Sequence, residues 1–133
     1  EAFQILRAKS LGKYKAFRKG LDQLAAEGVV QILKNEARGD ASPVMAAVGP
    51  MQFEVMQARM EFEYNVETVT EPIPYSVARR TDAESAPELG RQRGVEIFTR
   101  QDGELIALFG DKWKLAFIEK EHPELTMETL VAD

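Results

Sequence analysis

The sequence predicts an α+β fold. Two segments of the 133-residue chain carry apolar side chains at helical spacing, short β-branched runs flank them, and Gly, Pro or Asn stands at several junctions. These signals predict the order strand, helix, strand, strand, helix, strand for residues 2–71. This is the ferredoxin-like, or split βαβ, arrangement, in which two helices cover one face of an antiparallel sheet. Because many unrelated functions occur on this fold, the order alone defines no activity.

The first strand and helix are expected in residues 2–28. Residues 2–8 form a short apolar run that predicts a strand. The helix begins near Lys13, ends at Gly28 and repeats its apolar positions at steps of three, four and three: Tyr14, Phe17, Leu21 and Leu24. Gly20 lies inside this helix at a cost of about 1 kcal/mol relative to alanine, which indicates that another backbone packs closely there.

Two strands, a second helix and a last strand complete the first half. Residues 29–33 and 43–48 are apolar or β-branched and are separated by a polar loop. Pro50 suits the first turn of the next helix, and Asn65 suits its end. The apolar positions of this helix are expected in the core rather than in a cofactor site: Phe53, Met56, Met60 and Tyr64. Residues 66–71 alternate like a half-buried strand.

Residues 72–93 are predicted to be a connector. They are largely polar and contain three prolines, with room for an extended run and a short helix. Residues 94–133 are expected to form a smaller unit of hairpin, helix and strand. The hairpin is predicted by Asp102 and Gly103, which separate two apolar runs.

The smaller unit has clear helix signals. Asp111 is a suitable N-cap for a helix over residues 112–121, and Pro123 follows the end of that helix. One side of the helix carries Trp113, Ala116 and Phe117. A final strand is expected over residues 125–131. No internal repeat is evident from the residues.

The composition is that of a globular protein with few means of catalysis. Hydrophobic residues make up 44% and charged residues 29%. The absence of cysteine excludes disulfides, a thiolate nucleophile and cysteine-based metal sites, and the single histidine excludes motifs that need two. His122 precedes Pro123 at a helix end, where its charged form suits the helix dipole, so a capping role is favoured over catalysis. No apolar run approaches the roughly 20 residues that span a bilayer, and a cytoplasmic monomer is expected.

The charge is unevenly distributed. Residues 1–20 have six basic side chains against Glu1, a net of +5, while the remainder has eleven basic and twenty-one acidic residues, a net of −10. The basic side chains of this segment are Arg7, Lys9, Lys13, Lys15, Arg18 and Lys19. Such a segment can bind phosphate or an acidic neighbour, although a solvated helix face is an equal alternative.

No nucleotide site or catalytic pair stands out. Gly49 and Pro50 precede a helix but belong to no G-x-x-x-x-G-K loop, so the chain has no visible means of binding or splitting GTP. No pair of carboxylates is distinguished among the 22 acidic residues. Two arginine clusters, Arg79 with Arg80 and Arg91 with Arg93, lack interleaved aromatic residues, which favours solvated loops over a single-strand RNA platform. We expect no enzyme, no catalytic residue, no metal and no cofactor in this chain.

Three runs resemble the C-terminal domain of peptide chain release factor 3, a translational GTPase family related to elongation factor G. They are KYKAFRKGLDQLAAEGVVQIL at 13–33, AAVGPMQFEVMQARMEFEYNVE at 46–67 and ALFGDKWKLAFIEKEHPEL at 107–125. Together they cover nearly the whole chain. Residues 1–70 are also similar, more distantly, to the third domain of elongation factor G, but Gln52 and Phe53 stand where that family has His and Leu, which favours the release factor.

The resemblance implies a role in translation termination. It implies that the chain is one C-terminal domain of a larger factor, whose GTPase domain binds GTP or GDP with magnesium and is joined by a β-barrel domain. The whole factor would promote dissociation of class I release factors from the ribosome after peptide release. This domain would contact the small ribosomal subunit, through its protein or its RNA, and the factor's own domains.

The expected contact residues combine the charge pattern with the resemblance. They are Lys13, Lys15, Arg18, Lys19, Arg79 and Arg80. The family often has Ala-Arg-Trp where this chain has Ala78, Arg79 and Arg80, so a contact made by that Trp would be replaced here by a charge contact from Arg80 to RNA. Two alternatives remain: a domain from a relative of elongation factor G, and a free-standing ferredoxin-like module that binds or converts a small molecule.

Overall fold

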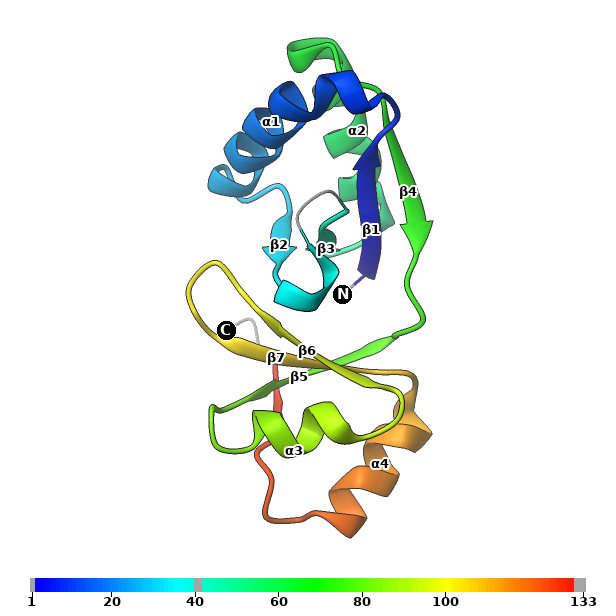
Figure 1. Cartoon of the computed structure of the whole chain (residues 1–133). Coiled ribbons are helices and arrows are strands. Elements are labelled where there is room, and N and C mark those ends of the chain that lie inside the picture. The colour runs from blue at the N-terminus through cyan, green and yellow to red at the C-terminus, as the bar shows by residue number, and fades with distance from the viewer. Residues whose placement is uncertain (1, 40–41, 131–133) are drawn as a thin grey trace. The chain divides into compact units, whose positions relative to one another are not determined.

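The computed structural model describes residues 2–39 and 42–130. The chain divides into two compact units, Glu1–Ile73 and Pro74–Asp133. Each unit has one four-stranded antiparallel sheet and its own helices (Figure 1). None of the helices within the described residues is long and apolar enough to cross a membrane.

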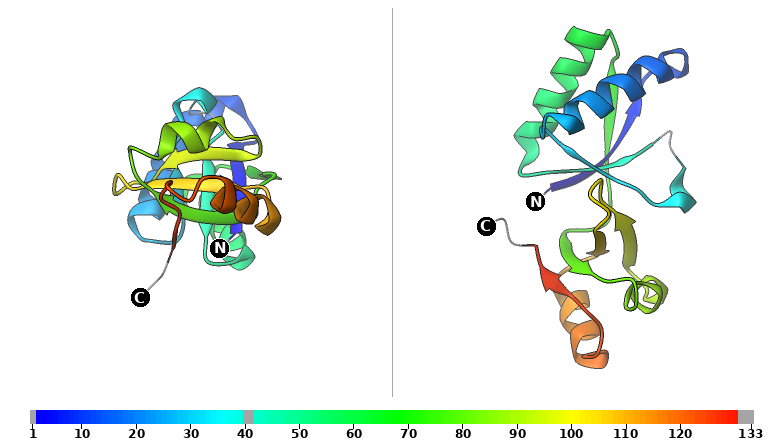
Figure 2. Two further views of the ribbon diagram at one scale, coloured as in Figure 1. Left: turned by 90° about the horizontal axis from the view of Figure 1, so that it is seen from below. Right: turned by 90° about the vertical axis from the view of Figure 1, so that its left-hand side faces the viewer.

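The first unit has the predicted ferredoxin-like order, which confirms the fold class. Its elements are β1 (Ala2–Ala8), α1 (Tyr14–Ala26), β2 (Gln31–Leu33), β3 (Val44–Ala47), α2 (Pro50–Tyr64) and β4 (Thr68–Pro72), with short 3-10 turns η1 (Leu11–Lys13) and η2 (Glu36–Arg38). The strands lie in the order β2-β3-β1-β4, and β1 pairs antiparallel with both β3 and β4. Both helices pack on one face of the sheet (Figure 2).

Alternation along the strands places the core of this unit. Leu6 of β1, Ile32 of β2 and Met45 of β3 point to the helices, where they join a buried apolar cluster. Most of the helical residues that the spacing predicted are in this core: Phe17, Leu21, Leu24, Phe53, Met56 and Met60. Of the other two, Tyr64 is partly buried against the core and Tyr14 is exposed. The core is therefore a layer between two helices and one sheet face.

Gly20 of α1 packs tightly against α2. A Cβ atom at Gly20 would lie 2.7 Å from Met60 Sδ and 2.8 Å from Tyr64 Cδ2. The sequence predicted close packing of a backbone here, and the structure corrects this: side chains of α2 fill the space. Asn65 ends α2 in the left-handed conformation, with φ of 56°, as expected.

The second unit repeats the topology of the first. Its elements are β5 (Val77–Thr81), α3 (Ala86–Arg91), β6 (Val95–Thr99), β7 (Leu105–Phe109), α4 (Lys112–Glu121) and β8 (Glu128–Thr129). The strand order β6-β7-β5-β8 matches β2-β3-β1-β4 position by position. Two ferredoxin-like arrangements thus follow one another in the chain.

This second arrangement differs from what the residues indicated. Residues 72–93 were predicted as a connector with an extended run and a short helix; these are β5 and α3, and they belong to the second unit, because the division between units falls between Ile73 and Pro74. β5 has the sequence VARRT, which has little strand character by itself; its strand structure comes from pairing with β7 on one side and β8 on the other. The final strand is shorter than the predicted 125–131, and residue 131 lies outside the described residues.

The hairpin and last helix of this unit follow the prediction. Gly103, with φ of 89°, turns the chain between β6 and β7, and the Arg100 N–H donates to Glu104 O at 2.8 Å. Asp111 Oδ1 accepts from the Lys114 N–H at 2.8 Å and so caps α4. The core lies on the other side of α4 from Trp113 and Phe117, and comprises Leu89, Val95, Ala107, Phe109, Leu115 and Ile118.

A polar cluster fastens the C-terminal segment of this unit. Asp82 accepts hydrogen bonds from the Thr126 hydroxyl at 2.6 Å and from the Ser85 N–H at 2.7 Å. The Thr126 N–H in turn donates to the buried Ser85 Oγ at 2.9 Å. These bonds lower the pKa of the Asp82 carboxyl below its ordinary value, the Thr126 hydroxyl contributing most.

Candidate nucleic-acid interface

Three of the predicted lysines form one exposed cationic surface. Lys13 ends η1, and Lys15 and Lys19 lie one turn apart on the solvent side of α1. Within residues 2–39 and 42–130 none of the three has an ion-pair partner. We refer to Lys13, Lys15 and Lys19 as the α1 lysine surface.

The other basic side chains of residues 1–20 are compensated. Arg7 Nε lies 2.6 Å from Glu71 Oε1, and Lys9 Nζ lies 3.3 Å from Glu67 Oε2. Arg18, also a predicted contact, is half-buried and lies 3.6 Å from Asp22 Oδ1. The uncompensated positive charge of this segment is therefore concentrated in the α1 lysine surface.

Arg79 and Arg80 do not form a joint patch. As neighbours in β5 they point to opposite faces of the sheet. Arg79 Nη1 donates to the carbonyl of Ala78 at 2.8 Å. Arg80 lies between two carboxylates, 3.3 Å from Glu104 and 3.4 Å from Glu128, so a contact from Arg80 to RNA would compete with both.

The outer side of α2 carries apolar residues that the sequence analysis did not single out. Met51, Val55, Ala58 and Phe62 recur at steps of four, three and four, and all are exposed, Phe62 by 92%. Glu54 and Glu61 lie along one edge of this stripe. The signal for this stripe in the sequence is a second set of apolar residues at helical spacing, on the side of α2 opposite Phe53, Met56 and Met60.

The outer side of α4 combines aromatic and basic residues. Trp113 is 83% exposed and Phe117 is 56% exposed, one turn apart. Lys114 Nζ lies 5.9 Å from the centre of the Phe117 ring, which is within the range of a cation–π contact. Lys112 and Lys120 are exposed on the same helix. The sequence places Trp113 and Phe117 on one side of a helix and predicts no function for them.

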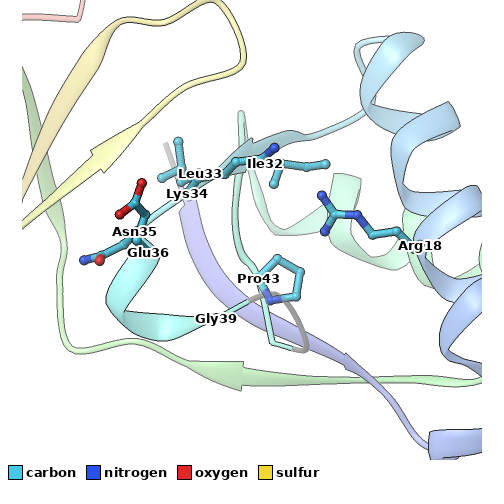
Figure 3. Close-up of a pocket in the computed structure, with 8 residues that line it drawn as sticks. All are labelled: Arg18, Ile32, Leu33, Lys34, Asn35, Glu36, Gly39 and Pro43. Atoms are coloured by element: carbon cyan, nitrogen blue, oxygen red, sulfur yellow. The ribbon is translucent and has the colours of Figure 1, made fainter.

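A hollow beside α1 is too small for a metabolite. Arg18 borders it, opposite Ile32 of β2 and Pro43 (Figure 3). Its volume is about 90 Å³ and its lining is mainly apolar. Small-molecule sites usually measure about 300–1,000 Å³, so this hollow is below their usual size.

An arginine links the two helices of the first unit. Arg59 of α2 donates from Nη1 to Glu27 Oε1 at 2.5 Å, at the end of α1, and from Nε to Glu63 Oε2 at 2.6 Å. Hydrogen bonds from Arg59 lower the pKa of both carboxyls. In the part of the chain that the structure describes, no group of three or more acidic or histidine side chains is arranged to hold a metal ion.

Comparison with known proteins assigns the chain to a family. The geometry defines a class first: an α+β module of two ferredoxin-like units whose candidate site is an exposed charged surface. Residues 1–119 match the family described as class II release factor RF3, C-terminal domain. The chain belongs to this family.

Curated relatives carry the same family name. The chain is 39% identical over 132 residues to "Peptide chain release factor 3" of Synechococcus elongatus, with 98% of this chain and 24% of that protein covered. It is 40% identical over 129 residues to the protein of that name in Trichodesmium erythraeum, and 37% identical over 127 residues to that of Symbiobacterium thermophilum. These two matches cover 96% and 94% of this chain, and 24% of each relative. The chain thus spans about a quarter of the length of these relatives.

Proposed function

We propose that this chain is the ribosome-binding C-terminal domain of a translation-termination GTPase in the cytoplasm. The parent factor would bind GTP or GDP with magnesium in a separate GTPase domain and carry a β-barrel domain. It would promote dissociation of class I release factors after peptide release. The observation that carries the proposal is the family match over residues 1–119.

The α1 lysine surface supports a binding role within that proposal. Three uncompensated ammonium groups on one side of η1 and α1 suit the phosphates of ribosomal RNA in the small subunit, alongside contacts to ribosomal protein. Arg18 lies near this surface but is partly neutralised by Asp22. Arg79 and Arg80 are secondary candidates, because Arg80 already has two carboxylate partners.

The test uses the full-length factor with Lys13, Lys15 and Lys19 all changed to Ala. We expect weaker binding to ribosomes and a shallower dependence of the binding constant on salt. The magnitude of the slope of log K against log salt should decrease by about two to three, since each phosphate contact contributes about 0.7–0.9 to it. Filter binding or sedimentation at several salt concentrations measures both quantities.

The matched control is Lys9→Ala, which removes a lysine that is already paired with Glu67. This variant should bind ribosomes nearly as the unmodified factor does. If the triple variant kept the affinity and the salt slope of the unmodified factor, the assignment of the α1 lysine surface would be wrong.

A further inference from the structure

We propose that the outer side of α4 is a second RNA-contact surface, which takes unpaired nucleotides. The proposal rests on the function proposed above, to which it adds a site and a ligand class. Its residues are Trp113, Phe117, Lys112, Lys114 and Lys120, which we call the α4 aromatic surface. None of them was among the expected contact residues.

Exposure shows that the two rings are not core residues. Leu115 and Ile118 are the side chains with which α4 packs on its sheet, at 5% and 0% exposure. Trp113, Phe117 and Lys120 recur at steps of four and three, so they share the opposite side of the helix. Both aromatic rings are thus largely open to solvent next to a cation.

The surrounding charge favours nucleic acid over an apolar protein surface. Lys114 adjoins the Phe117 ring, and its aliphatic stem passes over Gly94, where a Cβ atom would lie 3.2 Å from Lys114 Cε. Exposed Arg93 precedes Gly94. Glu119 projects away from the rings, whereas Glu121 lies one turn after Phe117 and is outnumbered there by Lys114 and Lys120. In single-strand recognition, aromatic rings stack on bases while basic side chains meet the phosphates.

The apolar stripe of α2 provides the contrast. It holds Phe62, which is even more exposed than Trp113, but its flanking Glu54 and Glu61 would repel phosphate and α2 has no lysine to offset them. Unpaired nucleotides are the appropriate class for α4, because bases within an RNA duplex do not expose their faces for stacking. The proposed ligand is therefore a loop, bulge or single-stranded segment of RNA.

The experiment uses intrinsic fluorescence, since Trp113 is the only tryptophan in the sequence. The chain is titrated with an oligouridylate of about ten nucleotides, and the emission of Trp113 is recorded at several salt concentrations. Stacking of a base on the indole should quench the emission. Three lysine contacts should give a log–log salt slope of about −2, at roughly 0.7 per phosphate of a single strand.

Variants assign the binding to this surface. Phe117→Ala should weaken the binding of the oligouridylate about ten-fold, in line with the loss of one stacked base. Lys112→Ala combined with Lys120→Ala should reduce the magnitude of the salt slope by about 1.4, at roughly 0.7 for each lost phosphate contact. The matched control Phe62→Ala, which removes an exposed Phe from α2, should change neither quantity. Far-UV circular dichroism checks that each variant retains its fold.

Two results would overturn the proposal: no quenching of Trp113 by the RNA, or unchanged binding by Phe117→Ala. If RNA gave no quenching but Trp113→Ala weakened ribosome binding of the full-length factor, the surface would be a protein contact and the RNA assignment would be wrong. The variants of the α1 lysine surface test the proposed function separately. If the triple lysine variant lost ribosome affinity as expected while the α4 variants bound RNA unchanged, only the assignment of the α4 aromatic surface would be rejected.

Discussion

The two units share one topology, but different interactions stabilise each unit internally. In the first unit, α1 and α2 pack directly on each other at Gly20, and Arg59 links α2 to the end of α1. In the second unit, α3 has only six residues, and the hydrogen bonds of Asp82 and Ser85 to Thr126 fasten the C-terminal segment. A strand order that is set by pairing therefore tolerates different means of stabilisation.

Substitution of the glycines inside α1 and α3, Gly20 and Gly90, should reveal this difference with the largest change in stability. In α1, Gly20→Ala should lower the free energy of unfolding by about 1–3 kcal/mol through overpacking. The better helix propensity of alanine offsets about 1 kcal/mol of this loss. The clash is with Met60 and the Tyr64 ring. In α3, Gly90→Ala should raise the free energy of unfolding by about 0.5–1 kcal/mol, because its Cβ would meet only Ile97 at 3.4 Å.

Urea denaturation followed by circular dichroism measures both changes. Opposite signs for the two substitutions would show that α1 needs its glycine for packing whereas α3 does not. Equal stabilisation by both would contradict the close approach of α1 and α2 at Gly20.

Elements that depend on local chemistry were predicted reliably from the residues. The cap at Asp111, the turn at Gly103 and the left-handed end of α2 at Asn65 each depend on one residue and its neighbours, and all three were predicted. β5 depends on hydrogen bonds to β7 and β8, which are distant in sequence, so the extended run expected there could not be assigned to a sheet from the residues alone. The repeated topology was missed for the same reason.

The candidate surfaces were predictable to a similar degree. Charge counting identified Lys13, Lys15 and Lys19, but it could not show that Arg80 lies between Glu104 and Glu128. The outward direction of Trp113 and Phe117 could not be told from an inward one, because α4 has apolar residues on both sides. Only the position of the sheet decides which side is covered.

The polar cluster of the second unit leads to a smaller, pH-dependent effect. The folded-state pKa of Asp82 is lowered, so its contribution to stability is complete above the ordinary carboxyl pKa near 4 and is lost as the pH falls through the folded value. Asp82→Asn should therefore reduce the urea midpoint at pH 7 more than at pH 3. Thr126→Val, which removes the main donor, should reproduce part of this difference. If the urea midpoints of the variant and the unmodified chain differed by the same amount at pH 7 and at pH 3, the ionised Asp82 would not contribute to stability through this cluster.

The smallest expected effect concerns Arg59, whose ion pairs are at the surface. Arg59→Lys keeps the charge but loses the planar fork that reaches Glu27 and Glu63 together. Because exposed pairs are weak and screened by salt, the urea midpoint should fall slightly at low salt and hardly at all at high salt. The loss should also disappear as the pH drops below the ordinary glutamate value near 4.5, since both carboxyls have lowered pKa values that the pairing sustains. Arg91→Lys is the matched control in the second unit, because Arg91 reaches only Glu88 on its own helix. An equal effect of the two substitutions would mean that the link between α1 and α2 adds nothing beyond a pair within one helix.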